Sequence, residues 1–239
     1  MTIKKNIPNI ITLLNLFCGC IALIFALNRD FENTFYFVSL GIFLDFFDGF
    51  FARLFRVSSP FGLQLDSLAD MVTSGVVPGV VMYQLLKSST YVSAFDYPIK
   101  LLPFLGFMIT LGSCYRLANF NIDTRQTDSF IGLPTPANAL FILSLPLILQ
   151  HSNTIIVLEL LTNHWILLLI TLWSVYMLNA EIPLFSLKIK YFNFNKNILQ
   201  ILFLLLSILG LLLLQFLAIP LLIISYILLS KINNVFLKK

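Results

Sequence analysis

Charged residues are scarce in this chain of 239 residues. They make up 11% of it, against about 25% in soluble domains, while hydrophobic residues make up 59%. This composition excludes an ordinary soluble domain and predicts an integral membrane protein. The formal charge is +4, but the basic residues are not clustered with aromatic side chains on which bases could stack. We therefore expect no nucleic-acid partner.

Cysteine and histidine are also rare, with three and two copies. Three cysteines in an apolar chain are too few for a disulfide scaffold. Cys18 and Cys20 point to different sides of one expected helix, which makes them poor joint zinc ligands. His151 and His164 lie far apart near expected loops. We interpret these residues as inert thiols and interfacial histidines.

Eight apolar segments divide the chain, each near the ~20 residues that cross ~30 Å of hydrocarbon. They run over about 8–27, 34–54, 63–87, 98–118, 135–150, 155–178, 197–215 and 218–236. We expect an all-α integral membrane protein, with eight transmembrane helices in one bundle around a polar, cytoplasm-facing cavity. The fifth segment is short and contains Pro146, and a tight connection before Pro220 joins the seventh and eighth, so two of these segments could also form one crossing.

No part of the chain resembles a separate soluble domain, so we expect a single membrane domain over residues 1–239. Its catalytic core should cover about residues 8–180. Residues 197–236 are mostly leucine and isoleucine with few polar residues, which favours a two-helix scaffold or dimerisation element.

The lysines and arginines indicate the orientation in the membrane. With the N-terminus inside, twelve of the fifteen fall on the inner side, and only Arg29, Lys87 and Lys100 fall outside. Basic residues concentrate in cytoplasmic loops. The sequence therefore predicts a multi-pass protein of the bacterial inner (cytoplasmic) membrane with both termini in the cytoplasm.

Four carboxylates lie within two neighbouring apolar segments at helical spacing: Asp45 and Asp48 on one, Asp66 and Asp70 on the next. Residues three and four apart share a helix face. Each intramembrane carboxylate costs about 2.5–3.5 kcal/mol on insertion scales. Divalent metal ions are the natural partners, and two ions would cancel four negative charges and hold a diphosphate.

The neighbours of these carboxylates fit a bound ligand. Gly49 lets a ligand approach the helix backbone, and Ala52 keeps the next turn small. Arg53 brings a planar guanidinium suited to a phosphate or a base edge. Asp70 lies one turn beyond Asp66 and is either a metal ligand or a proton acceptor. A single intramembrane aspartate is often only a packed polar residue, but that reading does not explain four in register.

The pattern D-x2-D-G-x2-A-R-x8-G-x3-D-x3-D, from Asp45 to Asp70, resembles the signature of the CDP-alcohol phosphotransferases at every fixed position. The resemblance implies that an alcohol hydroxyl attacks the β-phosphorus of a CDP-linked substrate and that CMP leaves. It implies two divalent metal ions, Mg²⁺ or Mn²⁺, bound by Asp45, Asp48, Asp66 and Asp70, with Asp70 also the catalytic base. It further implies a homodimer.

The same resemblance assigns the nucleotide side. The start of the first segment, Pro8-Asn9-Ile10-Ile11, is similar to the family's nucleotide-side segment. Asn9, Thr12 and Asn15 share one helix face there, which suggests a polar lining, although Asn9 is equally read as a helix cap. The expected CDP-binding residues are Pro8, Asn9, Thr12, Gly49, Ala52, Arg53, Ser59 and Gly62.

Three further elements resemble the phosphatidylserine synthase branch of this family. They are the run that begins L-D-S-L-A-D at Leu65, R-L-A at Arg116, and F-I-G-L-P-T-P-A at Phe130. The chain departs from that branch at Thr73-Ser74, at Val77, which replaces an alanine, and at Asn119, which replaces an arginine. The branch implies transfer of the phosphatidyl group from CDP-diacylglycerol to L-serine within a membrane of lipids. The acceptor candidates are Thr73, Ser74, Arg116 and Asn121.

Physical chemistry leaves several readings open. Arg116 suits the serine carboxylate but is also read as a positive-inside anchor. Thr73 and Ser74 could hydrogen-bond a small acceptor or bond back within their own helix. The same chemistry would serve glycerol 3-phosphate, inositol phosphate or choline. A cation-coupled transporter also buries carboxylates, but it would more often show repeats and broken helices in both halves.

Overall fold

The computed structural model describes residues 2–57, 59–89, 99–123, 130–152, 154–184 and 198–237. These residues form helices and one pair of two-residue strands. The helices are α1 (Thr2–Leu27), α2 (Phe31–Phe55), α3 (Pro60–Asp70), η1 (Met71–Val76), α4 (Val77–Ser88), η2 (Ile99–Phe107), α6 (Met108–Ile122), α7 (Thr135–His151), α8 (Ile155–Thr162), α9 (His164–Asn179), α10 (Ile198–Leu214), η4 (Gln215–Leu217) and α11 (Ala218–Leu237). The strands are β1 (Phe130–Ile131) and β2 (Pro183–Leu184).

Local signals place a tight turn between α2 and α3. Helix α2 ends at Phe55 and is capped by Arg56, which adopts the left-handed conformation with φ of 54°. Helix α3 begins with Ser59, whose side chain accepts a hydrogen bond from Gly62 N at 3.0 Å, and with Pro60 in its first turn. Both are standard helix-start signals. The turn sets the aspartates of α2 opposite those of α3.

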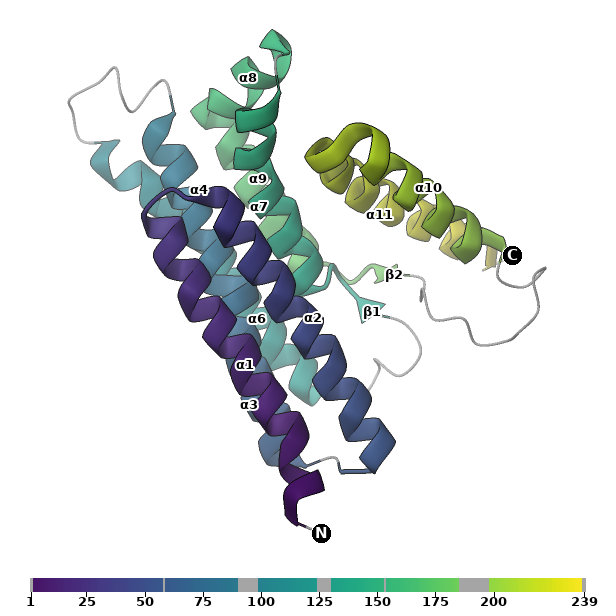
Figure 1. Ribbon diagram of the computed structural model, residues 1–239. Coiled ribbons are helices and arrows are strands. Elements are labelled where there is room, and N and C mark those ends of the chain that lie inside the picture. The colour runs from purple at the N-terminus through teal and green to yellow at the C-terminus, as the bar shows by residue number, and fades with distance from the viewer. Residues whose placement is uncertain are drawn as a thin grey trace.

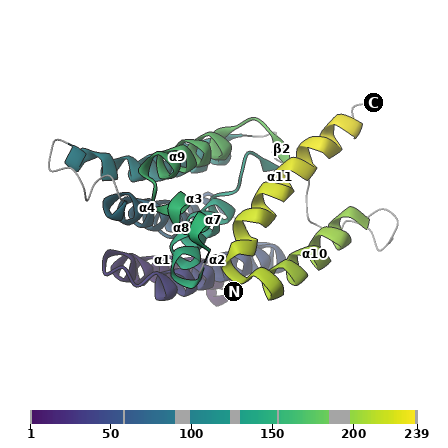
Figure 2. The same cartoon turned by 90° about the horizontal axis from the view of Figure 1, so that it is seen from above.

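The helices pack in layers. Seen from above, α1 and α2 lie along one side, α4 and α7 in the middle, and α9 on the far side (Figure 2). Helices α1 and α2 pack side by side along most of their length (Figure 1). The apolar core fills the space between these layers, and its fully buried members include Val38, Val77, Met82, Leu86 and Ile142.

Within the described residues, five helical stretches are long and apolar enough to cross a membrane. They are Asn6–Leu27, Phe31–Phe55, Pro60–Ser88, Leu101–Ile122 and Leu202–Ile232. Helices α8 and α9 make a sixth when the pair, bent by 71°, counts as one crossing. The all-helical membrane class predicted from the sequence is confirmed at this level.

The eight expected crossings differ from these stretches for local reasons. The expected segment 135–150 forms α7, which has only 17 residues. The expected segment 155–178 breaks at Asn163, whose side chain accepts a hydrogen bond from Trp165 N at 2.9 Å and so caps a new helix. The expected segments 197–215 and 218–236 form one stretch that folds back at η4, where Gln215 has φ of 49° (Figures 1 and 2). Eight crossings therefore stay a prediction.

Helix α10 lies to one side of the other helices, while its partner α11 packs against α7 and β2 (Figure 2). The turn between them, η4, is held by Phe216, whose ring lies 5.5 Å from Phe35 of α2 and 5.3 Å from His151 of α7. Most of the described side chains of α10 are exposed. This arrangement agrees with a separate scaffold or dimerisation element, which stays a prediction.

A short segment before α7, Phe130–Pro134, is called the strap here. It is hydrogen-bonded to the end of α9 and to Arg116 of α6. Its strand β1 pairs antiparallel with β2, Phe130 with Leu184 and Ile131 with Pro183. Gly132 has φ of 73°, and a β-carbon there would lie 2.7 Å from the carbonyl oxygen of Leu178. Only glycine fits so close an approach at positive φ. The strap thus fixes the start of α7 against the end of α9.

Candidate active site

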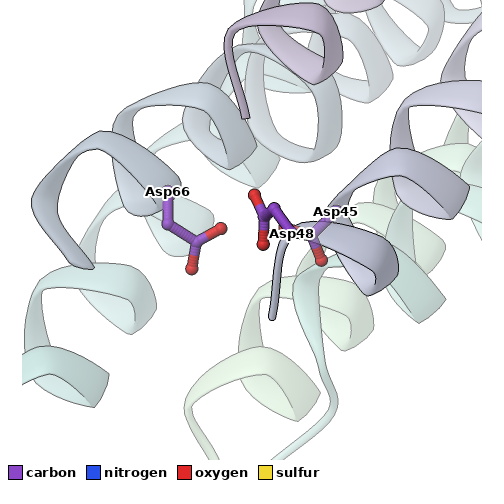
Figure 3. Close-up of side chains that lie close together, drawn as sticks. All are labelled: Asp45, Asp48 and Asp66. Atoms are coloured by element: carbon purple, nitrogen blue, oxygen red, sulfur yellow. The ribbon is translucent and has the colours of Figure 1, made fainter. Parts of the chain in front are cut away.

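Three aspartates converge between α2 and α3. Carboxylate oxygens of Asp45, Asp48 and Asp66 lie within 4.8 Å of one another. Figure 3 shows Asp45 and Asp48 from one helix and Asp66 from the other, with their carboxylates turned toward the same space. The helical spacing seen in the sequence therefore becomes a cluster of oxygen ligands.

The cluster fits a hard divalent cation. Asp66 Oδ1 is buried and is among the few buried oxygens of the described residues without a hydrogen-bond partner. Asp48 is buried, and its Oδ2 accepts a hydrogen bond from Thr12 Oγ1 at 2.5 Å. Converging carboxylates with an unsatisfied oxygen are the donor set that Mg²⁺ and Mn²⁺ prefer.

Asp70 lies outside this three-residue cluster but lines the same cavity. It is buried, and its Oδ1 accepts a hydrogen bond from Asn15 Nδ2 at 3.1 Å. Helix α1 therefore supports two of the four aspartates, Asp48 through Thr12 and Asp70 through Asn15. Sequence reasoning placed Asn15 on a polar face but assigned it no partner.

The aspartates open into a cavity of about 370 Å³. Arg53 from α2 and Arg116 from α6 bring positive charge to it. The lining residues are Asp45, Phe46, Asp48, Gly49, Arg53, Asp66, Ser67, Asp70, Arg116, Leu117, Phe120, Pro134, Thr135 and Pro136. The cavity thus has an acidic wall, two basic side chains and an apolar remainder.

A second cavity of about 180 Å³ adjoins the first and shares Asp48, Gly49 and Asp66 with it. It gathers every predicted nucleotide-side residue except Arg53, which lines the larger cavity. Its lining comprises Pro8, Asn9, Thr12, Asp48, Gly49, Ala52, Val57, Ser59, Gly62, Leu63 and Asp66. Three separate sequence segments therefore meet at one place.

Glycine keeps this second cavity open. A β-carbon at Gly62 would lie 3.2 Å from Ser59 Oγ and 3.3 Å from Asn9 Oδ1. A β-carbon at Gly49 would lie 3.4 Å from Arg53 Nη1, so the guanidinium rests over this glycine. Any larger side chain at Gly62 would displace the two polar groups that line the pocket.

Arg116 is held in place by the strap. The side chain is buried, and its Nη1 donates to the carbonyl oxygens of Ile131 at 3.0 Å and Leu178 at 3.3 Å. This burial disfavours the reading of Arg116 as an exposed anchor. Asn119 lies with Arg116 on a smaller polar pocket beside the site, not in the main cavity.

The other acceptor candidates lie behind the cavity wall. Thr73 and Ser74 are fully buried just past Asp70 and are not part of the cavity lining. Asn121 Nδ2 donates to Ser67 Oγ at 2.9 Å, and Ser67 lines the cavity. Sequence reasoning missed Ser67 and Thr135 as lining residues, although both belong to the motifs that it singled out.

Comparison with known proteins places these residues in a family. The sequence model described as CDP-alcohol phosphatidyltransferase matches residues 5–177, which include all four aspartates. The CDP-diacylglycerol–serine O-phosphatidyltransferase of Bacillus subtilis is 37% identical over 134 residues, covering 54% of this chain and 69% of that protein. The protein of the same name from Helicobacter pylori (strain 26695) is 32% identical over 200 residues, covering 82% and 79%. An archaetidylserine synthase of Methanothermobacter thermautotrophicus is 27% identical over 140 residues, covering 58% and 56%.

Removal of one carboxylate from the cluster should weaken binding of a divalent ion. Asp66→Asn keeps the size of the side chain but removes a charge and an anionic ligand. We expect the Kd for Mn²⁺ to rise by at least about tenfold, measured by electron paramagnetic resonance on the detergent-purified protein. Glu159→Gln, at an exposed position on α8, is the matched control and should bind Mn²⁺ normally. Unchanged binding in Asp66→Asn would contradict the metal site.

Proposed function

The chain belongs to the CDP-alcohol phosphatidyltransferase family, and from that membership we propose that it transfers the phosphatidyl group of CDP-diacylglycerol to L-serine, giving phosphatidylserine and CMP. The observation that carries the proposal is the aspartate cluster at the junction of two cavities. Such a junction can hold a diphosphate between a nucleotide and an acceptor. The names of the similar proteins support serine as the acceptor.

The nucleotide occupies the smaller cavity in this proposal. Asn9 and Ser59 offer polar atoms at its wall, and Gly49 and Ala52 leave room beside α2. Arg53 lies over Gly49 at the boundary with the larger cavity. A guanidinium at this boundary is suited to the diphosphate, because it can donate two parallel hydrogen bonds to phosphate oxygens.

Asp45, Asp48 and Asp66 would hold a divalent ion, and Asp70 would complete the ligands of a second, either Mg²⁺ or Mn²⁺. When bound, such ions neutralise the charge of a diphosphate and make its phosphorus more electrophilic. The carboxylates of α2 and α3 would hold the diphosphate only through these ions, because carboxylate and phosphate oxygens repel one another.

The acceptor occupies the larger cavity. Serine is zwitterionic, and Arg116 offers a fixed cation for its carboxylate, with Ser67 and Thr135 as nearby hydroxyl groups. Asp70 accepts the proton of the serine hydroxyl while a bond forms from its oxygen to the β-phosphorus. The bond from that phosphorus to the CMP oxygen breaks. Asn121 acts through Ser67, while contacts of Thr73 and Ser74 with serine stay predictions.

The competing readings fit less well. Glycerol 3-phosphate, inositol phosphate and choline would use the same carboxylates, but the similar proteins are named for serine. A cation-coupled transporter is not supported, because the carboxylates are confined to one pair of helices and the family model covers them.

We also propose the membrane arrangement expected from the sequence: eight crossings, a cytoplasm-facing cavity, both termini in the cytoplasm of a bacterial cell, and a homodimer. Contacts at the end opposite the site support it. His151 Nε2 lies 3.4 Å from Glu32 Oε1, and Phe216 packs on Phe35, so the turns before α2, after α7 and at η4 gather there. The basic residues Arg125, Lys188, Lys190 and Lys196 lie outside the described residues.

The acceptor is tested by product analysis. Purified protein with CDP-diacylglycerol, Mn²⁺ and serine should release CMP and phosphatidylserine in equal amounts. Both products are measured by chromatography and mass spectrometry. A chelator should abolish the formation of both. Arg116→Ala should raise the apparent KM for serine more than that for CDP-diacylglycerol, with Arg116→Lys as the charge-keeping control. Equal activity with glycerol 3-phosphate, or none with serine, would refute the acceptor.

Asp70 and Asp66 should differ in kinetics. Asp70→Asn keeps an oxygen but removes the proton acceptor, so turnover should fall by about 10²–10⁴, the usual contribution of a general base, while CDP-diacylglycerol binding is largely kept. Asp66→Asn should weaken nucleotide and metal binding together. Steady-state kinetics and equilibrium binding separate the two, and near wild-type turnover in Asp70→Asn would remove Asp70 as the base.

The orientation is tested by reporter fusions in cells. Fusions after residues 30, 92, 153 and 217 should all report the outer side, because the basic residues place the intervening ends inside. A fusion after residue 57 is the control and should report the cytoplasm. A cytoplasmic signal at residue 153 would show that the short α7 segment does not cross.

A further inference from the structure

Asn15 is a fully buried polar residue in the middle of α1. Its Nδ2 donates to Asp70 Oδ1 at 3.1 Å, and its Oδ1 accepts from Thr73 Oγ1 at 2.9 Å. The amide thus stands between the base of the proposed reaction and a threonine on the same membrane segment. No role for Asn15 follows from the family signature in the sequence.

Asp70 and Thr73 together fix which way the Asn15 amide points. An ionised carboxylate only accepts hydrogen bonds, so the NH₂ faces Asp70, and the amide oxygen then accepts from the Thr73 hydroxyl. The Thr73 hydroxyl also lies 3.2 Å from the carbonyl oxygen of Ala69 and 3.3 Å from that of Asn15, which keeps its rotamer fixed. Without this hydroxyl, the amide oxygen loses its donor, and the Asn15 side chain is held less firmly against Asp70.

Helix η1 places Thr73 in this position. Met71–Val76 is a π-helix, in which Val77 N donates to the carbonyl oxygen of Val72, five residues earlier. Such single-turn insertions change the direction of the side chains that follow and often occur at functional sites. Here the turn begins directly after Asp70 and directs Thr73 toward α1.

The surrounding backbone leaves no room for another arrangement. A β-carbon at Gly41 would lie 2.8 Å from Asn15 Oδ1 and 2.9 Å from Thr73 Cγ2, and one at Gly19 would lie 2.5 Å from Thr73 Oγ1. Helices α1 and α2 therefore approach the pair as closely as glycine allows. This packing holds the Thr73–Asn15–Asp70 chain in one geometry.

We propose that Asn15, oriented by Thr73, is a positioning residue of the reaction, which fixes the Asp70 carboxylate through Oδ1 and leaves Oδ2 for the acceptor hydroxyl. The proposal rests on the proposed function, in which Asp70 is the base. A neutral amide suits this position because it restrains an anion by hydrogen bonding without cancelling the charge that accepts the proton. A lysine in place of Asn15 would neutralise the charge of the Asp70 carboxylate.

The chain supplies a matched control for Thr73. Thr110 of α6 donates its hydroxyl to the carbonyl oxygen of Gly75 at 3.0 Å, in the same π-helix, and among the described residues it bonds to neither Asn15 nor Asp70. Thr73→Val and Thr110→Val each replace a hydroxyl by a methyl group of similar size. The first removes the contacts of Thr73 with Asn15 and Ala69, and the second removes the contact of Thr110 with Gly75. Only Thr73→Val releases the Asn15 amide.

The experiment compares Thr73→Val, Thr73→Ser and Thr110→Val in the full-length protein, purified in detergent, by kcat, both KM values, Mn²⁺ affinity and thermal stability. We expect Thr73→Val to lower kcat by about tenfold, the effect of one hydrogen bond, with both KM values and the Mn²⁺ affinity within about twofold of wild type. Thr73→Ser keeps the hydroxyl and should recover most of kcat. Thr110→Val should keep the wild-type kcat even if its thermal stability falls as much as that of Thr73→Val.

Asn15→Asp provides a second test that does not depend on the folding of Thr73→Val. It keeps the side-chain size but replaces the donor by an oxygen and should lower kcat by at least about tenfold. In an Asp70→Asn background, Thr73→Val should have no further effect on kcat, because the residue it positions is already disabled.

Several results would overturn the positioning role. They are equal kcat losses in Thr73→Val and Thr110→Val, wild-type kcat in Asn15→Asp, or a rise in the KM for serine with kcat kept in Thr73→Val, which would make Thr73 an acceptor ligand. Failure of the wild-type protein to form phosphatidylserine would refute the proposed function instead. The two failures are therefore distinguishable.

Discussion

The cost of burying four carboxylates in an apolar helix bundle governs the rest of this structure. Each costs about 2.5–3.5 kcal/mol on insertion scales, and a repulsive group of like charges costs more. The protein meets this cost with neutral hydrogen-bond donors from α1, two arginines and a geometry that suits divalent ions. Close contact of α1 with α2 and α3 is a direct consequence, because Thr12 and Asn15 must reach across to Asp48 and Asp70.

Sequence reasoning recovered the parts of the site that depend on regular helix geometry. The stripes of aspartates and the polar face at the start of α1 obey a period of 3.6 residues, and the structure brings them to one place. The period also places Thr73 on the stripe of Asp66 and Asp70, but it does not show the π-helix that follows Asp70 or the contact of Thr73 with Asn15. The polar face of α1 showed Asn15, but only the packing of η1 against α1 shows what Asn15 contacts.

The number of membrane-spanning helices also could not be predicted from the hydrophobic pattern alone. Hydropathy identifies apolar stretches but not the points at which a helix bends or reverses. Asn163 breaks one stretch by capping a new helix within it, and Gln215 reverses another through a left-handed backbone conformation. Likewise, the strap that fixes Arg116 depends on Gly132 at a positive φ, which the motif F-I-G-L-P suggests only after the fold is known.

The two cavities adjoin at Asp48, Gly49 and Asp66, the three residues that line both. A nucleotide in one cavity and an alcohol in the other would meet the phosphorus from opposite faces. A single in-line displacement inverts the stereochemical configuration at phosphorus, whereas a detour through a phosphatidylated side chain would retain it. If the two substrates occupy the two cavities as proposed, the arrangement of the cavities favours inversion.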